Sequence, residues 1–244
     1  MNHNGPLDPD RLPTHVGIIM DGNGRWAKRR GKSRRYGHRE GLKAAKRVVK
    51  TASDIGLNTL SLYVFSTENW KRAEREISYL MLLIKIHLKK EFDFYRKNRI
   101  RIVHSGDLQR LPPDIKDEVR RAVDETAVYN GLTVNLAINY GGRDEIIRAV
   151  GRWISNESGN GKTLDHRDLT EKKLSLYLDN PGVPDPDLII RTSGEMRISN
   201  FLLWESPYSE LYFSTKCWPE WDGQDLIEAI DSYQKRERRF GCSE

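Results

Sequence analysis

The strongest constraint on the fold is an alternation of short apolar runs with longer segments of helical periodicity. The apolar runs are predicted strands, at residues 16–20, 59–65, 99–105, 133–139, 187–191 and 211–214. Between them, apolar residues recur at steps of three and four, which predicts helices near 42–52, 77–95, 115–122 and 146–154, and a last one over about 223–239. Because strands that alternate with such helices form βαβ units, we predict a single α/β domain: a mainly parallel central sheet of about six strands, with helices on both faces.

Length and composition point to a stable protein without covalent or metal staples. A chain of 244 residues can bury a substantial core unaided, and Cys217 and Cys242 lack the spacing of a zinc site. No apolar run approaches the roughly 18 residues that span a bilayer, which predicts a cytoplasmic protein. Residues 1–14 are expected to form a flexible segment before a domain that covers 15–244, and residues 155–170 a polar surface loop.

The positive charge of the chain is local. Net charge is +6, yet residues 25–39 hold eight Arg or Lys and no acid, so the remainder sums to +6 − 8 = −2. This favours a binding site over a generally cationic protein. A nucleic-acid-binding α/β protein is the alternative, because Trp26 and Tyr36 are interleaved with the basic residues. We predict no nucleic-acid partner, since an aspartate at the end of a strand suits a phosphate groove only with a metal ion.

In an open parallel sheet, ligands bind beyond the carboxyl ends of the strands. The loops expected at this edge of the sheet are therefore 21–25, 66–72, 105–107, 139–143 and 191–197. The first partly matches a dinucleotide fingerprint, but its continuation is too charged and is interrupted by Gly31 and Gly37, so that interpretation is rejected.

Residues 21–25 read Asp-Gly-Asn-Gly-Arg, a sequence suited to an oxygen-rich anion. The glycines let backbone N–H groups approach the anion, and Arg25 and Arg34 can donate forked hydrogen bonds. Asp21 would repel a phosphate unless a hard cation lies between them, and Mg²⁺ commonly binds one or two carboxylates together with substrate phosphates. The alternative is that Asp21 only caps a turn.

Two further loops carry polar side chains. The stretch from Ser66 to Arg72 is either a polar cluster at a strand end or an ordinary helix-capping signal. Arg191, Arg197 and Ser199 suggest a second anion pocket, with surface salt bridges as the alternative. Glu210 is either a second carboxylate for a metal or a solvated residue. Two anion pockets on one sheet edge indicate two phosphorylated substrates.

Several sequence blocks resemble the cis-prenyltransferases, the isoprenyl transferases of the undecaprenyl diphosphate synthase type. They are HVGIIMDGNGRWAKRRG, YGHREG, LYVFSTENWKR, NYGGRDEI, RTSGEMRISNFLLWE, ELYFS and RERRFG, and they follow the family's order from about residue 15 to 241. The resemblance implies a Mg²⁺-dependent transferase that condenses isopentenyl diphosphate repeatedly, in cis, onto an allylic diphosphate such as farnesyl diphosphate. The implied product is a long-chain polyprenyl diphosphate, the undecaprenyl carrier precursor of peptidoglycan synthesis.

The resemblance also implies roles for individual residues. Asp21 is the essential carboxylate for metal and diphosphate, and Glu210 is a metal ligand. Asn69 is the family's usual proton acceptor. Because a neutral amide is a weak base, a role for Asn69 in orienting the substrate is physically easier. The residues implied around the allylic diphosphate are Gly22, Asn23, Gly24, Arg25, Trp26, Arg34 and His38. Those at the reacting end are Ser66, Thr67, Glu68, Trp70 and Arg72. Those that hold isopentenyl diphosphate are Arg191, Arg197, Ile198 and Ser199.

The remaining implications concern the product and the assembly. An apolar tunnel for the growing chain is expected along the helix of residues 77–95, with Leu136 and Ile138 near its floor. Family members are commonly homodimers, so Arg239 and Gly241 are expected near the partner's site. A peripheral membrane contact for product release is also expected.

Overall fold

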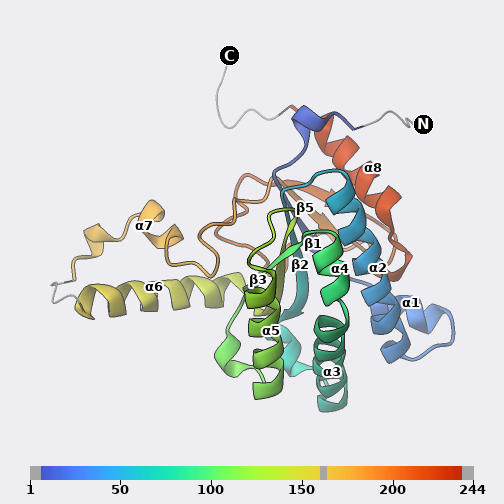
Figure 1. The fold of residues 1–244 in the computed structure, drawn as a ribbon, viewed down its shortest axis with the longest axis horizontal. Coiled ribbons are helices and arrows are strands. Elements are labelled where there is room, and N and C mark those ends of the chain that lie inside the picture. The colour runs from blue at the N-terminus through green and yellow to red at the C-terminus, as the bar shows by residue number, and fades with distance from the viewer. Residues whose placement is uncertain (1–6, 160–163, 238–244) are drawn as a thin grey trace.

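A computed structural model describes residues 7–159 and 164–237 of the chain. The fold is built on one parallel sheet (Figure 1). Its six strands lie in the order β3-β4-β2-β1-β5-β6, and every neighbouring pair is parallel. The strands are β1 (His15–Ile19), β2 (Thr59–Ser66), β3 (Arg101–Ser105), β4 (Thr133–Tyr140), β5 (Leu188–Arg191) and β6 (Glu210–Phe213). The predicted single α/β domain with a parallel sheet of six strands is therefore confirmed.

Eight α-helices lie within the described ranges. They are α1 (Asn23–Arg29), α2 (Arg34–Asp54), α3 (Glu74–Lys90), α4 (Phe92–Lys97), α5 (Pro113–Thr126), α6 (Gly142–Gly159), α7 (Glu171–Ser175) and α8 (Gly223–Gln234). Short 3₁₀ turns include η2 (Thr67–Lys71) and η3 (Leu108–Arg110). None of the helices described is long and apolar enough to cross a membrane.

The main core lies on one face of the sheet. Val16 and Ile18 of β1 point into it, and the buried residues of α2, α3, α5 and α8 pack on them and on the neighbouring strands. Helices were expected on both faces, but loop residues Phe201 and Leu202 pack against Ile19 on the second face. The reason is that α6 projects from the sheet, and its apolar residue Ala149 packs against Leu174 and Leu178 near α7 instead (Figure 1).

The packing of α1 against α2 depends on two glycines. A Cβ atom on Gly37 would overlap the backbone oxygen of Asn23, and one on Gly41 would overlap the Asn23 side chain. Gly37, which looked like an interruption in the sequence, thus lies inside α2 and permits close approach of α1. Ser33 caps α2, its side chain accepting a hydrogen bond from the Tyr36 N–H at 3.3 Å.

Several element bounds differ from the sequence prediction. The helix expected over 77–95 breaks at Glu91 into α3 and α4, and α8 ends at Gln234 instead of near 239. The first five residues of the expected polar loop 155–170 belong to α6. From residue 7 the N-terminal segment contacts the domain: Asp8 N–H donates to the Gln234 side chain at 3.2 Å. Residues 1–6 lie outside the described ranges.

Candidate active site

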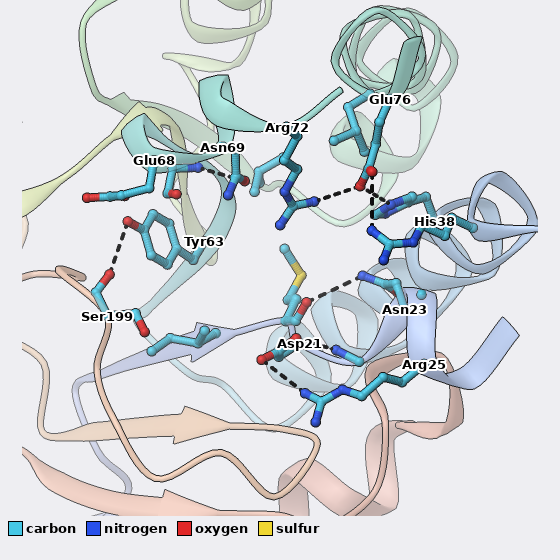
Figure 2. A pocket seen from close by; sticks show the side chains of 18 of the residues that line it. Asp21, Asn23, Arg25, His38, Tyr63, Glu68, Asn69, Arg72, Glu76 and Ser199 are labelled. Atoms are coloured by element: carbon cyan, nitrogen blue, oxygen red, sulfur yellow. Dashed lines mark hydrogen bonds and ion pairs between the residues drawn. The ribbon is translucent and has the colours of Figure 1, made fainter. Parts of the chain in front are cut away.

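The loops that follow β1, β2 and β5 meet at the carboxyl edge of the sheet, around a cleft of about 690 Å³ (Figure 2). Thirteen of the residues expected at the site line this cleft. They are Asp21, Gly22, Asn23, Gly24, Arg25, Arg34, His38, Ser66, Glu68, Asn69, Arg72, Arg191 and Ser199. The structure thus brings together three loops that are separated by up to 170 residues in the sequence.

Asp21 lies where the two expected anion pockets meet. Its Oδ2 accepts a hydrogen bond from Arg191 Nη2 at 3.0 Å and lies 3.3 Å from Arg25 Nη2, while Oδ1 accepts from the Gly22 N–H at 2.6 Å. Burial alone would raise the pKa of the Asp21 carboxyl, but Arg191, Gly22 and Arg25 outweigh it and hold the pKa below its usual range. Asp21 is therefore an anion shared between two guanidinium groups, which is more than a turn cap.

The backbone beside Asp21 requires glycine. Gly22 has φ +96°, a left-handed conformation, and a Cβ atom there would clash with the side chain of Ser193. Arg25 then extends from the first turn of α1, between Asp21 and Glu195, whose Oε1 lies 2.8 Å from Arg25 Nη1. Trp26 does not line the cleft; it stacks on Tyr36 with ring centroids 5.8 Å apart.

Arg191 lies at the second expected anion pocket, and its side chain is buried. Its side chain is 5% exposed, and Nη1 donates to the Arg197 backbone oxygen and to Ser199 Oγ, both at 2.6 Å. Its Nε has no hydrogen-bond partner among the residues that the structure describes. Arg197 itself is 61% exposed and pairs with Glu195, so its backbone, not its guanidinium, contacts Arg191 here.

The loop that carries these contacts has an unusual backbone. Ser193, Ser199, Asn200 and Leu202 all have positive φ values, between 46° and 78°. Ile198 packs against the small core cluster on the second face of the sheet, which anchors the loop. Such backbone strain persists only where surrounding contacts determine it, so the second pocket is rigidly preorganised.

The loop after β2 is both a capped turn and a wall of the cleft. Ser66 N–H donates to Asn69 Oδ1 at 3.2 Å, which is the capping alternative considered from the sequence. Glu68 Oε1 accepts from Asn200 Nδ2 at 2.8 Å, so the loop is tied to the Arg191 side of the cleft. Trp70 points away, donating to Asn139 Oδ1 at 2.7 Å, and neither Trp70 nor Thr67 lines the cleft.

Glu76 is a cleft residue that the sequence reasoning missed. It lies in the first turn of α3, and its carboxylate contacts Arg72 at 3.0 Å, Arg34 at 3.3 Å and His38 at 3.5 Å (Figure 2). Burial would raise the pKa of Glu76, but Arg72, Arg34 and His38 together lower it. Burial also lowers the pKa of His38, and the charge of Glu76 offsets this only in part.

The spacing of four residues between Arg72 and Glu76 is the sequence signal that could have predicted their contact. Tyr63 and Asn200 were missed as well.

Glu210 lies at the other edge of the sheet. It begins β6, where it is paired in register with Leu188 of β5 and through it with Val16, whereas Asp21 follows the end of β1. Its Oε2 is 2.6 Å from Arg236 Nη1. The expected combination of Glu210 with Asp21 at one metal is therefore not found within a single chain. In the described part of the chain, no three His, Cys, Asp or Glu side chains group as a ready-made metal site.

A small apolar cavity of about 110 Å³ adjoins the cleft, where the tunnel was expected. It shares Met20, His38, Tyr63, Val64 and Leu80 with the cleft, and its other lining residues include Leu42, Leu83, Ile84, Leu88, Leu136 and Ile138. The cavity is far too small for a chain of tens of carbon atoms, so the tunnel itself remains a prediction. Arg239 and Gly241, expected near a partner's site, lie outside the described residues.

Fold and cleft together define an α/β protein with a cleft rich in cationic side chains at the carboxyl edge of a parallel sheet, the edge where such folds bind their ligands. The family model of the undecaprenyl diphosphate synthases (Prenyltransf) matches residues 19–241, and the chain belongs to this family. An isoprenyl transferase of Treponema denticola is 51% identical over 227 residues, which cover 93% of this chain and 96% of the relative.

Two solved structures are similar over almost the whole chain. Lavandulyl diphosphate synthase from Lavandula x intermedia, solved with dimethylallyl diphosphate, has a TM-score of 0.89 and 34% identity, covering 96% of this chain and 100% of its own. A structure described as "a probable undecaprenyl diphosphate synthase" from Campylobacter jejuni has a TM-score of 0.78 and 34% identity, covering 94% of this chain and 99% of its own.

Proposed function

We propose that this protein is a cis-prenyltransferase that condenses isopentenyl diphosphate repeatedly onto an allylic diphosphate, with farnesyl diphosphate as primer. Its product would be a long-chain polyprenyl diphosphate, the undecaprenyl carrier precursor for peptidoglycan. Family membership and the isoprenyl transferase relative support the reaction class. The observation that carries the proposal is Asp21, held between two cationic pockets by Arg25 on one side and Arg191 on the other.

Each pocket takes one diphosphate in this proposal. The allylic diphosphate lies against Arg25 and Arg34, with His38 and Arg72 close by, because all four line the cleft with Asp21, and Arg34, His38 and Arg72 are held together by Glu76. Isopentenyl diphosphate lies against Arg191 and Ser199. Two clamps on one cleft bring the reacting carbons together and convert a bimolecular encounter into an oriented one.

Mg²⁺ fits this cleft only with help from the substrate. Asp21 is an ionised carboxylate beside the proposed allylic diphosphate, and one carboxylate with phosphate oxygens is a donor set that Mg²⁺ uses. We therefore assign Asp21, and not Glu210, as the protein ligand within one chain. When bound, Mg²⁺ supplies positive charge that stabilises the departing diphosphate.

The chain's own residues then govern the bond changes. The allylic C1–O bond breaks and diphosphate leaves, with its growing charge stabilised by Arg25 and Arg34. The double bond of isopentenyl diphosphate attacks C1 through its C4, and a proton leaves from its C2. Asn69 is a poor acceptor for that proton, because Asn69 Oδ1 already accepts the Ser66 N–H. We assign Asn69 to positioning, and the proton to an oxygen of the released diphosphate.

The remaining proposals concern product and assembly. Elongation requires the small apolar cavity between α2, α3 and the sheet to widen, and Leu42, which lines it, is placed to restrict the width. A homodimer in which Arg239 and Gly241 approach the partner's site stays part of the proposal, as does a cytoplasmic location.

The proposed function is tested by incubating the purified full-length protein with farnesyl diphosphate and labelled isopentenyl diphosphate. Butanol-extractable labelled product should form with Mg²⁺ and disappear when a chelator removes the metal. Mass spectrometry of the product then gives its chain length. No labelled product with any divalent metal would sink the proposal, whereas undiminished product in chelator would sink only the assignment of Mg²⁺.

A further inference from the structure

Two of the loops expected at the carboxyl edge, 105–107 and 139–143, are not used by the proposed function. The structure joins them through Asn139 and the backbone of Asp107. The Asp107 N–H donates to the Asn139 backbone oxygen at 3.1 Å, and Asn139 Nδ2 donates to the Asp107 backbone oxygen at 2.8 Å. Asn139 is 0% exposed, so its side chain acts inside the protein and does not touch a substrate in the cleft.

Asn139 lies at a β-bulge near the end of β4. Phe65 of β2 is paired with Ile138, and the next residue, Ser66, is paired with Tyr140. The strand β4 therefore has one extra residue at this point, which is Asn139. Its φ is +53°, a left-handed conformation that is uncommon outside glycine and in which asparagine is enriched. Bulges beside active sites turn a side chain in a direction that a regular strand does not allow.

The bulge directs the Asn139 amide to Trp70, in the loop that follows β2. Trp70 Nε1 donates to Asn139 Oδ1 at 2.7 Å, and the indole packs edge-on against Phe65, with ring centroids 5.1 Å apart. Trp70 packs on the main core, whereas Asn69 before it and Arg72 after it line the cleft (Figure 2). Because a buried N–H without a partner is costly, the bond to Asn139 fixes where this loop lies.

The position of Trp70 determines the positions of its neighbours. Asn69 Oδ1 accepts from the Ser66 N–H at 3.2 Å, and the Asn69 backbone oxygen accepts from the Arg72 N–H at 3.0 Å. These bonds make the turn one unit, so a displaced indole would move Asn69 and Arg72 together. Since Asn69 is assigned to positioning at the reacting end, the anchor of Trp70 bears on the reaction.

The same segment, 139–143, holds the loop of the second pocket. The Gly142 N–H donates to the Asn200 backbone oxygen at 2.7 Å, and the Arg143 N–H donates to Asn200 Oδ1 at 2.9 Å. Asn200 directly follows Ser199, which belongs to the second pocket. The segment after β4 therefore contacts both substrate loops, and it determines how one is placed relative to the other.

We propose that Asn139 is a positioning residue for the condensation reaction. It acts through Trp70, whose hydrogen bond to Asn139 holds Asn69 and Arg72 in place opposite the second pocket. This inference rests on the proposed function, because two loops align two diphosphates only if both diphosphates bind. Since a misplacement of about 1 Å can cost about a hundredfold in rate, loss of this one anchor is expected to cost about tenfold.

The test compares Trp70→Phe, Asn139→Gly and the double variant as full-length proteins, with farnesyl diphosphate, labelled isopentenyl diphosphate and Mg²⁺. Phenylalanine keeps an aromatic ring but lacks the N–H, and glycine adopts the φ of Asn139 but lacks the amide. Each single variant should lower kcat about tenfold and change the KM for isopentenyl diphosphate by less than about twofold. The double variant should also lose about tenfold, because all three remove the same hydrogen bond.

A matched control is Trp204→Phe, which removes another indole hydrogen bond, from Trp204 Nε1 to Ser175 Oγ at 3.0 Å, away from the cleft. Its kcat should equal that of the wild type. Circular dichroism gives the folded fraction of every variant, and kcat is expressed per folded molecule. The proposal is overturned by an unchanged kcat in Trp70→Phe, by an equal loss in Trp204→Phe, or by losses that multiply in the double variant.

Hydrogen exchange without substrates separates this proposal from the proposed function. The amides of Ser66 and Arg72, both bonded to Asn69, should exchange about tenfold faster in Trp70→Phe and Asn139→Gly, with β1 unchanged. A wild type that forms no labelled product sinks the proposed function, and faster exchange then supports the anchoring alone. Unchanged exchange overturns the proposal whatever the activity. If Asn139→Gly does not fold, Trp70→Phe decides by kcat and exchange.

Discussion

Two clusters of polar side chains lie against the central sheet. The carboxylates of one cluster are ionised, and the titratable groups of the other are neutral. At the carboxyl edge, Asp21 and Glu76 have lowered pKa values, because guanidinium groups outweigh the effect of burial. On the second face of the sheet burial dominates instead: it lowers the pKa of His15 to about 4 and raises the pKa of Glu205 to about 9. The carboxylates at the carboxyl edge are thus ionised, whereas Glu205 and His15 on the second face are neutral.

In the neutral cluster, His15 belongs to a network of hydrogen bonds. His15 Nδ1 lies 2.6 Å from the Pro184 backbone oxygen, which can only accept, so Nδ1 carries the proton and Nε2 accepts from Ser61 at 2.7 Å. Asn135 connects Ser61 to Ser105, at 3.0 Å on each side. These four hydrogen bonds all have partners inside the protein, which suits a structural role, whereas the buried Glu205 Oε2 has no hydrogen-bond partner among the described residues.

The charged cluster is open to solvent and can form further hydrogen bonds. Arg191 Nε has no hydrogen-bond partner in the part of the chain that the structure describes, and Arg25 divides its contacts between Asp21 and Glu195. The comparison indicates that ionised side chains lie in the cleft, where a ligand can contact them. On the second face, where no ligand would compensate the desolvation of a charge, the titratable side chains are neutral. Each prediction below changes one of these two clusters.

The largest effect is expected from Asp21→Asn, which preserves shape but removes the shared charge. Turnover should fall by about a thousandfold or more, roughly 4 kcal/mol of transition-state stabilisation, because the proposed Mg²⁺ ligand is lost. Steady-state assays with labelled isopentenyl diphosphate measure this. Asp107→Asn is the matched control: Asp107 also follows a strand, but among the described residues its side chain accepts a hydrogen bond only from the Gln109 N–H, at 2.9 Å. Near-normal turnover in Asp21→Asn would refute its role.

Arg191→Lys tests whether the second pocket needs a fork of donors. A lysine keeps the charge but cannot contact Asp21, Ser199 and the Arg197 backbone together. We expect kcat/KM for isopentenyl diphosphate to fall about a hundredfold, roughly 3 kcal/mol, with little change in the KM of the allylic substrate. Arg120→Lys, on the exposed face of α5, controls for a general effect. Equal losses for both substrates would contradict separate pockets.

The neutral cluster is tested by acid. The pKa of His15 is about 4 in the folded protein and about 6.5 when unfolded, so the unfolded state binds the proton first as pH falls. Folding should therefore lose about 3 kcal/mol through this residue between pH 6.5 and 4. Urea unfolding of the wild type and His15→Gln at several pH values measures it. Because the variant lacks this slope, parallel pH profiles would show that His15 is not the titrating group.

The sequence predicted the strands well because buried parallel strands are short, apolar and bounded by turn residues. Five of the six match their predicted bounds to within one residue at both ends. The third begins later, because Arg99 has φ +53° and cannot continue a strand. The break at Glu91 was not predictable from periodicity, since α4 continues the apolar pattern of α3.

The site was predictable where it depends on chain order and not where it depends on packing. Asp21 and Arg191 follow parallel strands, so both had to reach the same edge. The same rule places Glu210, the first residue of β6, at the opposite edge, although its residue type and the resemblance had both suggested a metal ligand. Glu76 meets Arg34 only because α2 and α3 pack side by side, which no local pattern records.

The smallest effect, and the finest test of the charged cluster, is expected from Glu76→Gln. Glu76 contacts Arg34, Arg72 and His38, so its carboxylate lies where the allylic diphosphate is proposed to bind. An anionic substrate would have to displace it, and losing partly exposed ion pairs costs about 1 kcal/mol. We expect the variant to lower the KM for farnesyl diphosphate about fivefold and to leave that for isopentenyl diphosphate unchanged. Glu74→Gln, exposed on the same turn of α3, should change neither. A higher KM for farnesyl diphosphate would mean that Glu76 orients these cations for the substrate instead of competing with it.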